Sequence, residues 1–165
     1  MKLNSLQDLY VSELKDLYDA ENRIIKALPK MAEAANSPDL RAAFEAHLQQ
    51  TRRHAERLEV ILRGLDESPK GQKCKGMEAI IDEGEDMMEK DAPGSVADAA
   101  LIAAAQRVEH YEIAGYGTVR AYARRLGFED QAELLNQTLQ EEGETDKKLT
   151  SLAEASINEE AKVAR

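Results

Sequence analysis

Apolar residues recur three, four or seven positions apart along most of this 165-residue chain, which is the spacing of one face of an α-helix. One such stripe runs from Leu40 through Phe44 and Leu58 to Leu65. No segment shows the strict apolar and polar alternation of a half-buried strand. The chain is therefore expected to fold as an all-α protein.

Capping signals and helix breakers divide the chain into segments. Ser5–Asp8 resembles a capping box, and Ser95–Asp98 is interpreted as a second one. Ser37-Pro38 opens another helix, Pro29 is expected to kink the first, and Gly127 is a natural helix end. The expected helices cover residues 5–35, 37–64, 76–91, 95–126 and 129–161, and the stretch 64–76 is a connection.

The lengths of the connections predict the topology. Tight turns near Asn36 and Gly127 make the flanking helices antiparallel, whereas the connection at 64–76 and the short helix after it are long enough to return along the bundle. The second and third main helices then run parallel. We therefore predict a single domain over residues 1–165, a ferritin-like four-helix bundle with one long crossover that contains a short extra helix.

Charge and composition narrow the class of function. The net charge of −10 disfavours binding to nucleic acid, and the short basic clusters Arg52-Arg53 and Arg124-Arg125 are explained by solvated helix faces. No apolar run is long enough for a membrane span, and Met1–Ser5 lacks a secretory pattern, so a cytoplasmic location is expected. The single cysteine, Cys74, cannot form an internal disulfide and is interpreted as incidental.

Polar residues on the inner stripes repeat at matching distances from the two tight turns. Those 15 residues from Asn36 or Gly127 are Glu21, Thr51, Glu112 and Glu142, and those 18 residues away are Tyr18, His54, Glu109 and Thr145. At a rise of about 1.5 Å per residue, the first set lies roughly 22 Å from its turn. By the same count His47 is level with Thr138.

Inward-facing carboxylates are costly unless they are paired or bound to a cation. Two divalent metal ions would supply the missing charge, and carboxylate and imidazole ligands suit iron or manganese, as well as zinc. The predicted metal ligands are Glu21, His54, Glu109, Glu112 and Glu142. For each glutamate alone, a solvated helix face is the simpler interpretation. His47 is a candidate for a ligand or a ligand's neighbour, and Asp146 for a ligand's neighbour or a partner of Lys148 or an arginine. One of the core tyrosines could bond to a ligand carboxylate.

Several motifs resemble one known family. The third main helix carries Gln106–Thr118, with the sequence QRVEHYEIAGYGT, and further matching segments are Leu17–Glu21, Phe44–Leu48, Glu56–Leu58, Glu141-Glu142 and Thr145–Thr150. Together they resemble the YciE/YciF family of ferritin-like stress proteins. The resemblance implies a ferritin-like bundle, a homodimer and an association with bacterial stress responses.

The chain departs from the usual di-iron pattern of ferritin-like proteins, in which two helices each carry a Glu-x-x-His pair. Its second main helix has Thr51-x-x-His54 and its fourth has Glu142-x-x-Thr145, so each pair retains one of the two ligands. The pair Glu109-x-x-Glu112 on the third could compensate. The chain also lacks the four-cysteine module that delivers electrons in rubrerythrins.

Three functions follow from these observations. The first is a metal-binding stress protein, with iron that reacts with a small oxidant such as peroxide or oxygen. The second is a non-enzymatic dimeric helical module with a degenerate metal site. The third is iron storage or DNA protection in a larger assembly, and the acidic charge without a basic tail disfavours contact with DNA.

Overall fold

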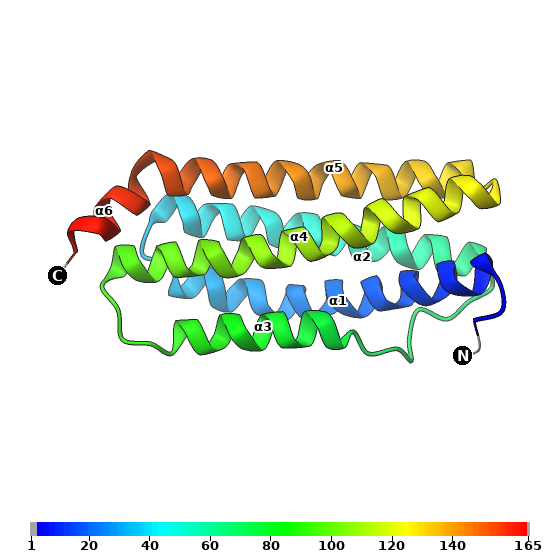
Figure 1. Ribbon diagram of the computed structural model, residues 1–165, viewed down its shortest axis with the longest axis horizontal. Helices are drawn as coiled ribbons and strands as arrows, with labels where there is room; N and C mark the ends of the chain where they lie inside the picture. The colour runs from blue at the N-terminus through cyan, green and yellow to red at the C-terminus, as the bar shows by residue number, and fades with distance from the viewer. Residues whose placement is uncertain (1–2, 165) are drawn as a thin grey trace.

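The computed structural model describes residues 3–164, and within them it contains helices and no strand (Figure 1). Four long helices form a bundle, and a shorter helix, α3, packs beside α1 and α4. The predicted all-α class is confirmed. The elements are α1 (Leu6–Ala34), α2 (Pro38–Gly64), α3 (Lys75–Met88), α4 (Gly94–Leu126), α5 (Glu129–Leu152), the π-helix η1 (Ala153–Ile157) and α6 (Asn158–Val163).

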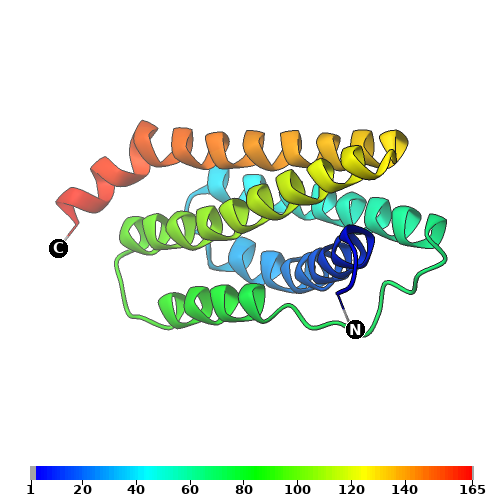
Figure 2. The ribbon, with the colours of Figure 1, turned by 45° about the vertical axis from the view of Figure 1, so that its right-hand side comes forward.

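The bundle has the predicted topology with one long crossover. The turn between α1 and α2 lies at one end of the bundle, and the turn between α4 and α5 lies at the other (Figure 1). Figure 2 shows the chain leaving α2, passing to α3 and only then entering α4. Consequently α2 and α4 run parallel, and residues counted from the two turns are counted from opposite ends of the molecule.

Three of the four predicted helix ends are confirmed in atomic detail. The Ser37 hydroxyl accepts a hydrogen bond from the backbone N–H of Leu40 at 3.4 Å, and Pro38 follows as the first residue of α2. The Ser5 hydroxyl accepts a hydrogen bond from the backbone N–H of Asp8 at 3.1 Å, which caps α1. Gly127 ends α4 with a φ of 79°, a left-handed conformation that glycine adopts without steric cost. The capping box at Ser95 is wrong, because α4 begins at Gly94 and its first turn has no side-chain cap.

Asp98, the last residue of that predicted box, instead serves the turn between α1 and α2. Its two carboxylate oxygens accept hydrogen bonds from the backbone N–H groups of Asn36 and Ser37, each at 2.8 Å. The side chain is buried, and it satisfies two donors that the turn itself leaves without partners. A contact between distant segments therefore outweighed the local capping signal.

The apolar core falls into two clusters along the bundle. One lies toward the α1–α2 turn and includes Leu28, Phe44 and Leu101, and the other lies toward the α4–α5 turn and includes Leu58 and Leu135. Between them, near the middle of each long helix, stands a layer of buried polar side chains. Its members are Glu21, His47, Thr51, His54, Glu109, Glu112, Thr138 and Glu142.

The last predicted helix is interrupted. A π-helical turn at Ala153–Ile157 separates α5 from α6, and the chain bends away from the bundle axis there (Figure 1). Across residues 3–164, no helix is both long and apolar enough to cross a membrane.

Candidate metal centre

The buried polar layer brings six potential metal ligands from four helices to one place. Each is at most 4% exposed. On α2 the two histidines are seven residues apart, which is two helical turns, so both imidazoles lie on the same face. The six are Glu21 from α1, His47 and His54 from α2, Glu109 and Glu112 from α4, and Glu142 from α5.

The first group consists of Glu21, His54 and Glu142. Nδ1 of His54 lies 2.7 Å from Oε1 of Glu142 and 3.6 Å from Oε1 of Glu21. One ligand atom from each of the three residues lies within 4.8 Å of the others. One imidazole and two carboxylates thus converge on a common point.

The second group consists of His47, Glu109, Glu112 and Glu142, again with ligand atoms within 4.8 Å of one another. Nε2 of His47 lies 3.1 Å from Oε1 of Glu109 and 3.8 Å from Oε2 of Glu142. Glu142 belongs to both groups and turns a different oxygen toward each histidine. A carboxylate shared in this way can bridge two cations.

The donor atoms in this layer fit metal ions because most of them lack a hydrogen-bond partner. A buried polar atom without a partner costs roughly 1–3 kcal/mol, and more if it is charged. The close imidazole–carboxylate contacts at His47 Nε2 and His54 Nδ1 do not have hydrogen-bond geometry. The atoms without partners are Glu21 Oε2, His47 Nε2, His54 Nδ1, Glu109 Oε2, both carboxylate oxygens of Glu112 and both of Glu142. Oxygen and imidazole donors of this kind suit iron, manganese or zinc.

Burial changes the protonation of these groups in the absence of a cation. It raises the pKa of Glu21 to about 7, that of Glu109 to about 8, and that of Glu112 well above its usual value. Burial alone would lower the pKa of His47, but the facing carboxylate of Glu109 outweighs it and the pKa rises to about 9. Metal ions at this site would therefore have to displace protons.

Neighbouring side chains orient the ligands. His54 Nε2 lies 2.8 Å from Oε2 of Glu141, and Arg57 donates to both oxygens of that carboxylate at 2.7 and 3.0 Å. Burial would raise the pKa of Glu141, but the hydrogen bonds from Arg57 and His54 lower it to about 2, so Glu141 stays ionised. A carboxylate on the outer nitrogen of a histidine holds the ring in position for a metal ion on the inner nitrogen. On the opposite side, the Tyr116 hydroxyl donates to Glu21 Oε1, as expected for one of the core tyrosines.

The five residues predicted from the sequence all lie in this layer, and His47 joins them. The predicted level of His47 is wrong: it faces Thr145 and Glu109 rather than Thr138. The count started from two turns that lie at opposite ends of the bundle, so equal counts meet only near the middle of the helices, and both His47 and Thr138 lie short of it. The heptad spacing of His47 and His54 was the signal that could have identified the second histidine.

Other residues that the sequence singled out lie outside the ligand groups. Thr51 donates to the backbone carbonyl of His47 at 2.9 Å, and Asp146 contacts the exposed His110 at 3.3 Å. Cys74 is not incidental. It is buried at the start of α3, where its sulfur accepts from the N–H of Met77 and contacts the Tyr111 hydroxyl at 3.1 Å.

The motifs that resemble a known family can now be compared with known proteins. The domain family described as "Domain of unknown function (DUF892)" matches residues 5–162, which is nearly the whole chain. The chain belongs to the DUF892 family. Protein YciF of Escherichia coli strain K12 is 42% identical over 162 residues, with 98% of each chain covered. The resemblance to YciF seen in the sequence is therefore confirmed.

Solved structures support the same assignment. The crystal structure of the E. coli stress protein YciF matches with a TM-score of 0.90 and covers 94% of this chain and 98% of that one. YcfI from Rhodopseudomonas palustris matches with a TM-score of 0.88 at 39% identity, covering 91% and 96%. A protein from Xanthomonas campestris, at 22% identity and a TM-score of 0.74, covers 92% of both chains and supports the fold alone.

Proposed function

We propose that this DUF892 protein binds two divalent metal ions in the middle of its bundle, iron first among them, and that it serves a stress response by reaction with a small oxidant. Glu142 carries this proposal. Both of its carboxylate oxygens are buried without a hydrogen-bond partner, and they point to two separate histidine-containing groups. A fully buried carboxylate in this state needs positive charge on both sides.

The two groups divide the ligands between the ions. Glu21, His54 and Glu142 would hold one ion, and His47, Glu109, Glu112 and Glu142 would hold the other. Bound iron would supply electron transfer to an oxidant. The protein side chains supply the rest: Glu142 would serve both ions, Glu141 orients His54, and Tyr116 holds Glu21 by a hydrogen bond. Burial of the layer keeps bulk water away, which strengthens every electrostatic interaction in it.

Iron loading tests the proposal. The metal-free protein is titrated with iron(II) without oxygen, and the bound iron per chain and the melting temperature are measured. We expect two ions per chain, each of which stabilises the protein by about 2.7 kcal/mol when free metal exceeds its Kd about 100-fold. Later addition of peroxide or oxygen should oxidise the bound iron faster than free iron.

Two variants sharpen this test. Glu112→Gln removes a ligand with two unpartnered oxygens and should lower the bound iron, whereas Glu144→Gln changes an exposed glutamate of α5 and should not. If Glu112→Gln binds as much iron as the unchanged protein, the ligand assignment is wrong.

A metal-free structural module is the second candidate function. One observation favours it: the raised pKa values of His47 and His54 favour protonated imidazoles, and the raised pKa values of three of the glutamates favour uncharged carboxyl groups, so the layer can balance its charge without a cation. Such a module would have a melting temperature that is indifferent to chelator and to added metal. A large metal-dependent rise in melting temperature would exclude it.

A further inference from the structure

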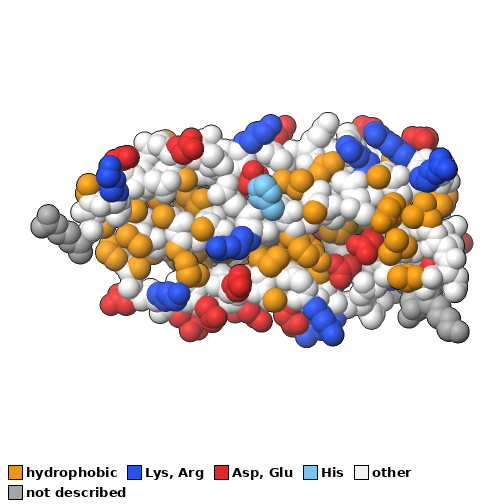
Figure 3. Space-filling view, viewed as in Figure 1, with side chains coloured by type: hydrophobic (Ala, Val, Ile, Leu, Met, Phe, Trp, Pro, Cys, Tyr) orange, Lys and Arg blue, Asp and Glu red, His pale blue; other side chains and the backbone are white. Residues whose placement is uncertain are grey.

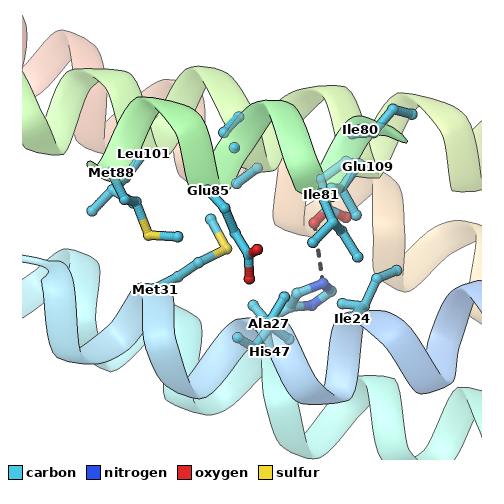
Figure 4. Close-up of a pocket in the computed structure, with 15 residues that line it drawn as sticks. Ile24, Ala27, Met31, His47, Ile80, Ile81, Glu85, Met88, Leu101 and Glu109 are labelled. Carbon is cyan, nitrogen blue, oxygen red and sulfur yellow. Dashed lines mark ion pairs between the residues drawn. The ribbon is translucent and has the colours of Figure 1, made fainter. Parts of the chain in front are cut away.

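An apolar cavity of about 30 Å³ lies between α3 and the bundle, and the candidate metal centre forms part of its wall (Figure 4). Met31 of α1, Ile81 and Met88 of α3 and Leu101 of α4 are among its apolar lining residues. Figure 4 shows that the ion pair between His47 and Glu109 closes its inner side. The cavity is large enough for a molecule of the size of water or slightly larger.

The amphipathic helix α3 covers this cavity on the side away from α2 and α5. Its inner face is apolar, with Met77 buried and Ile81 packed against the core, while acidic side chains gather on its outer side (Figure 3). Ion pairs from Arg23 to Glu78 and from Lys30 to Glu85, at 3.2 and 2.7 Å, tie it to α1. Among the residues of α3, Met77 is the one that is fully buried. The helix that covers the cavity is therefore attached to the bundle mainly by partly buried side chains and surface ion pairs.

A second cavity, of about 40 Å³, reaches the same His47–Glu109 edge from the side of α2 and α5. Its lining is more polar, because it includes Gln50, Thr145 and Lys148, whereas the cavity beneath α3 has the acidic Glu85 beside its apolar residues. Neither cavity is lined by Glu21 or His54. These ligands lie under Tyr116 and the Glu141–Arg57 pair, so both cavities meet the centre at its His47–Glu109 end.

We propose that the cavity beneath α3 binds a small, uncharged, apolar molecule of the size of dioxygen against the His47–Glu109 edge. A hydrated or charged molecule would lose most of its hydrogen bonds among these mainly apolar walls, and that loss is costly. The other cavity, with its polar side chains, suits water and ions. The use of the bound molecule as an oxidant rests on the proposed function, whereas its binding does not require metal.

Xenon provides a test that is independent of metal, because it occupies dry apolar cavities. Crystals of the metal-free protein are pressurised with xenon, and its anomalous scattering is located. We expect a xenon atom between Ile81, Met31 and Leu101. Absence of xenon from this cavity, or its presence only in the second one, would overturn the proposal.

Matched variants distinguish the two cavities. Ala104 lines only the cavity beneath α3 and Ala43 lines only the other, and both are buried on helices. Ala104→Leu should abolish xenon binding beneath α3, and Ala43→Leu should leave it unchanged. The Cβ atom of Ala104 lies 3.4 Å from where a Cβ atom on Gly84 would be, so a leucine there could displace α3. Ala27→Leu, which enters the same cavity from α1, is the second variant.

A kinetic measurement links the cavity to the proposed function. In iron-loaded protein, Ala104→Leu should slow oxidation by dioxygen severalfold at unchanged iron content, and it should slow oxidation by peroxide less. Equal slowing by both oxidants, or no slowing, would overturn the preference for an apolar molecule. If xenon binds beneath α3 but the protein takes up no iron, the proposed function fails while the cavity assignment stands.

Discussion

Oε1 of Glu142 lies 2.7 Å from Nδ1 of His54, which joins α5 to α2 at the middle of the bundle. The other oxygen of Glu142 lies 3.8 Å from Nε2 of His47, two helical turns away on α2. One carboxylate therefore stands between two imidazoles and belongs to both candidate metal groups. This position makes Glu142 the most informative residue for mutation.

Replacement of Glu142 should affect both metal ions, whereas replacement of Glu21 should affect one. Glu142→Gln removes the charge that both groups share, so we expect bound metal to fall from two ions per chain to fewer than one. Glu21 belongs only to the His54 group, so Glu21→Gln should retain one ion. Metal analysis of both variants after loading measures this difference. Equal metal content in the two variants would contradict a bridging Glu142.

The carboxylate behind His54 should control metal affinity without touching the metal. Glu141→Gln keeps the shape of the side chain but removes the charge that holds the outer nitrogen of His54. Loss of such a partner lowers metal affinity by roughly 10–100-fold. Titration with zinc(II), which is not redox-active, measures the affinity. Glu133→Gln, a change at an exposed residue of the same helix, is the control and should leave the affinity unchanged.

The metal-free protein should become less stable as pH rises from about 5 to 9. The pKa values of Glu21 (about 7), Glu109 (about 8) and His47 (about 9) lie above the ordinary values of these side chains, which are 4.5, 4.5 and 6.5. The folded protein thus binds more protons than the unfolded chain in this window, and its free energy of unfolding falls as they are released.

Metal should reverse that dependence, because cations compete with protons for the same atoms and bind better as pH rises. Melting temperatures of metal-free and metal-loaded protein, measured across this pH range, would show curves of opposite slope. A metal-free protein whose melting temperature rises from pH 6 to 9 would contradict the protonation that burial imposes on these groups.

Two glycines that flank Tyr116 should respond to alanine in opposite directions. A Cβ atom at Gly115 would lie 2.7 Å from Cδ2 of the buried Leu17, so Gly115→Ala crowds the contact between α1 and α4 and should cost about 1–2 kcal/mol. At Gly117 nothing lies within 4 Å, and Gly117→Ala should stabilise the helix by about 0.5–1 kcal/mol. Urea unfolding of both variants tests the close approach of the helices. Equal effects would show that Leu17 adapts.

Asp98 should stabilise the turn between α1 and α2 although it belongs to α4. Asp98→Ala leaves the backbone N–H groups of Asn36 and Ser37 without their charged acceptor, which should cost about 2–3 kcal/mol. Denaturant unfolding measures the loss, with the exposed Asp86→Ala as the control. A loss no larger than that of the control would mean that water replaces the carboxylate at this turn.

Much of the fold could be predicted from local signals. These signals are the stripes of apolar residues, the cap at Ser5 and the left-handed Gly127. Each of them acts within one or two helical turns, so the sequence alone was enough to predict them. The capping box predicted at Ser95 was wrong because Asp98 accepts a hydrogen bond from a residue more than 60 positions away in the chain. A local sequence pattern contains no information about such a distant contact.

The residues of the candidate site were likewise predicted from local signals, whereas the contacts between them were not. The sequence by itself determined that carboxylates and histidines would stand on inward faces near mid-helix, because burial follows the helical period. Only the tertiary structure decided which of them meet. It placed the two tight turns at opposite ends, so that His47 faces Glu109 and Thr145, and it set Glu142 between both histidines. Levels across a bundle depend on the direction of each helix and on packing between helices, and both are properties of the assembled molecule.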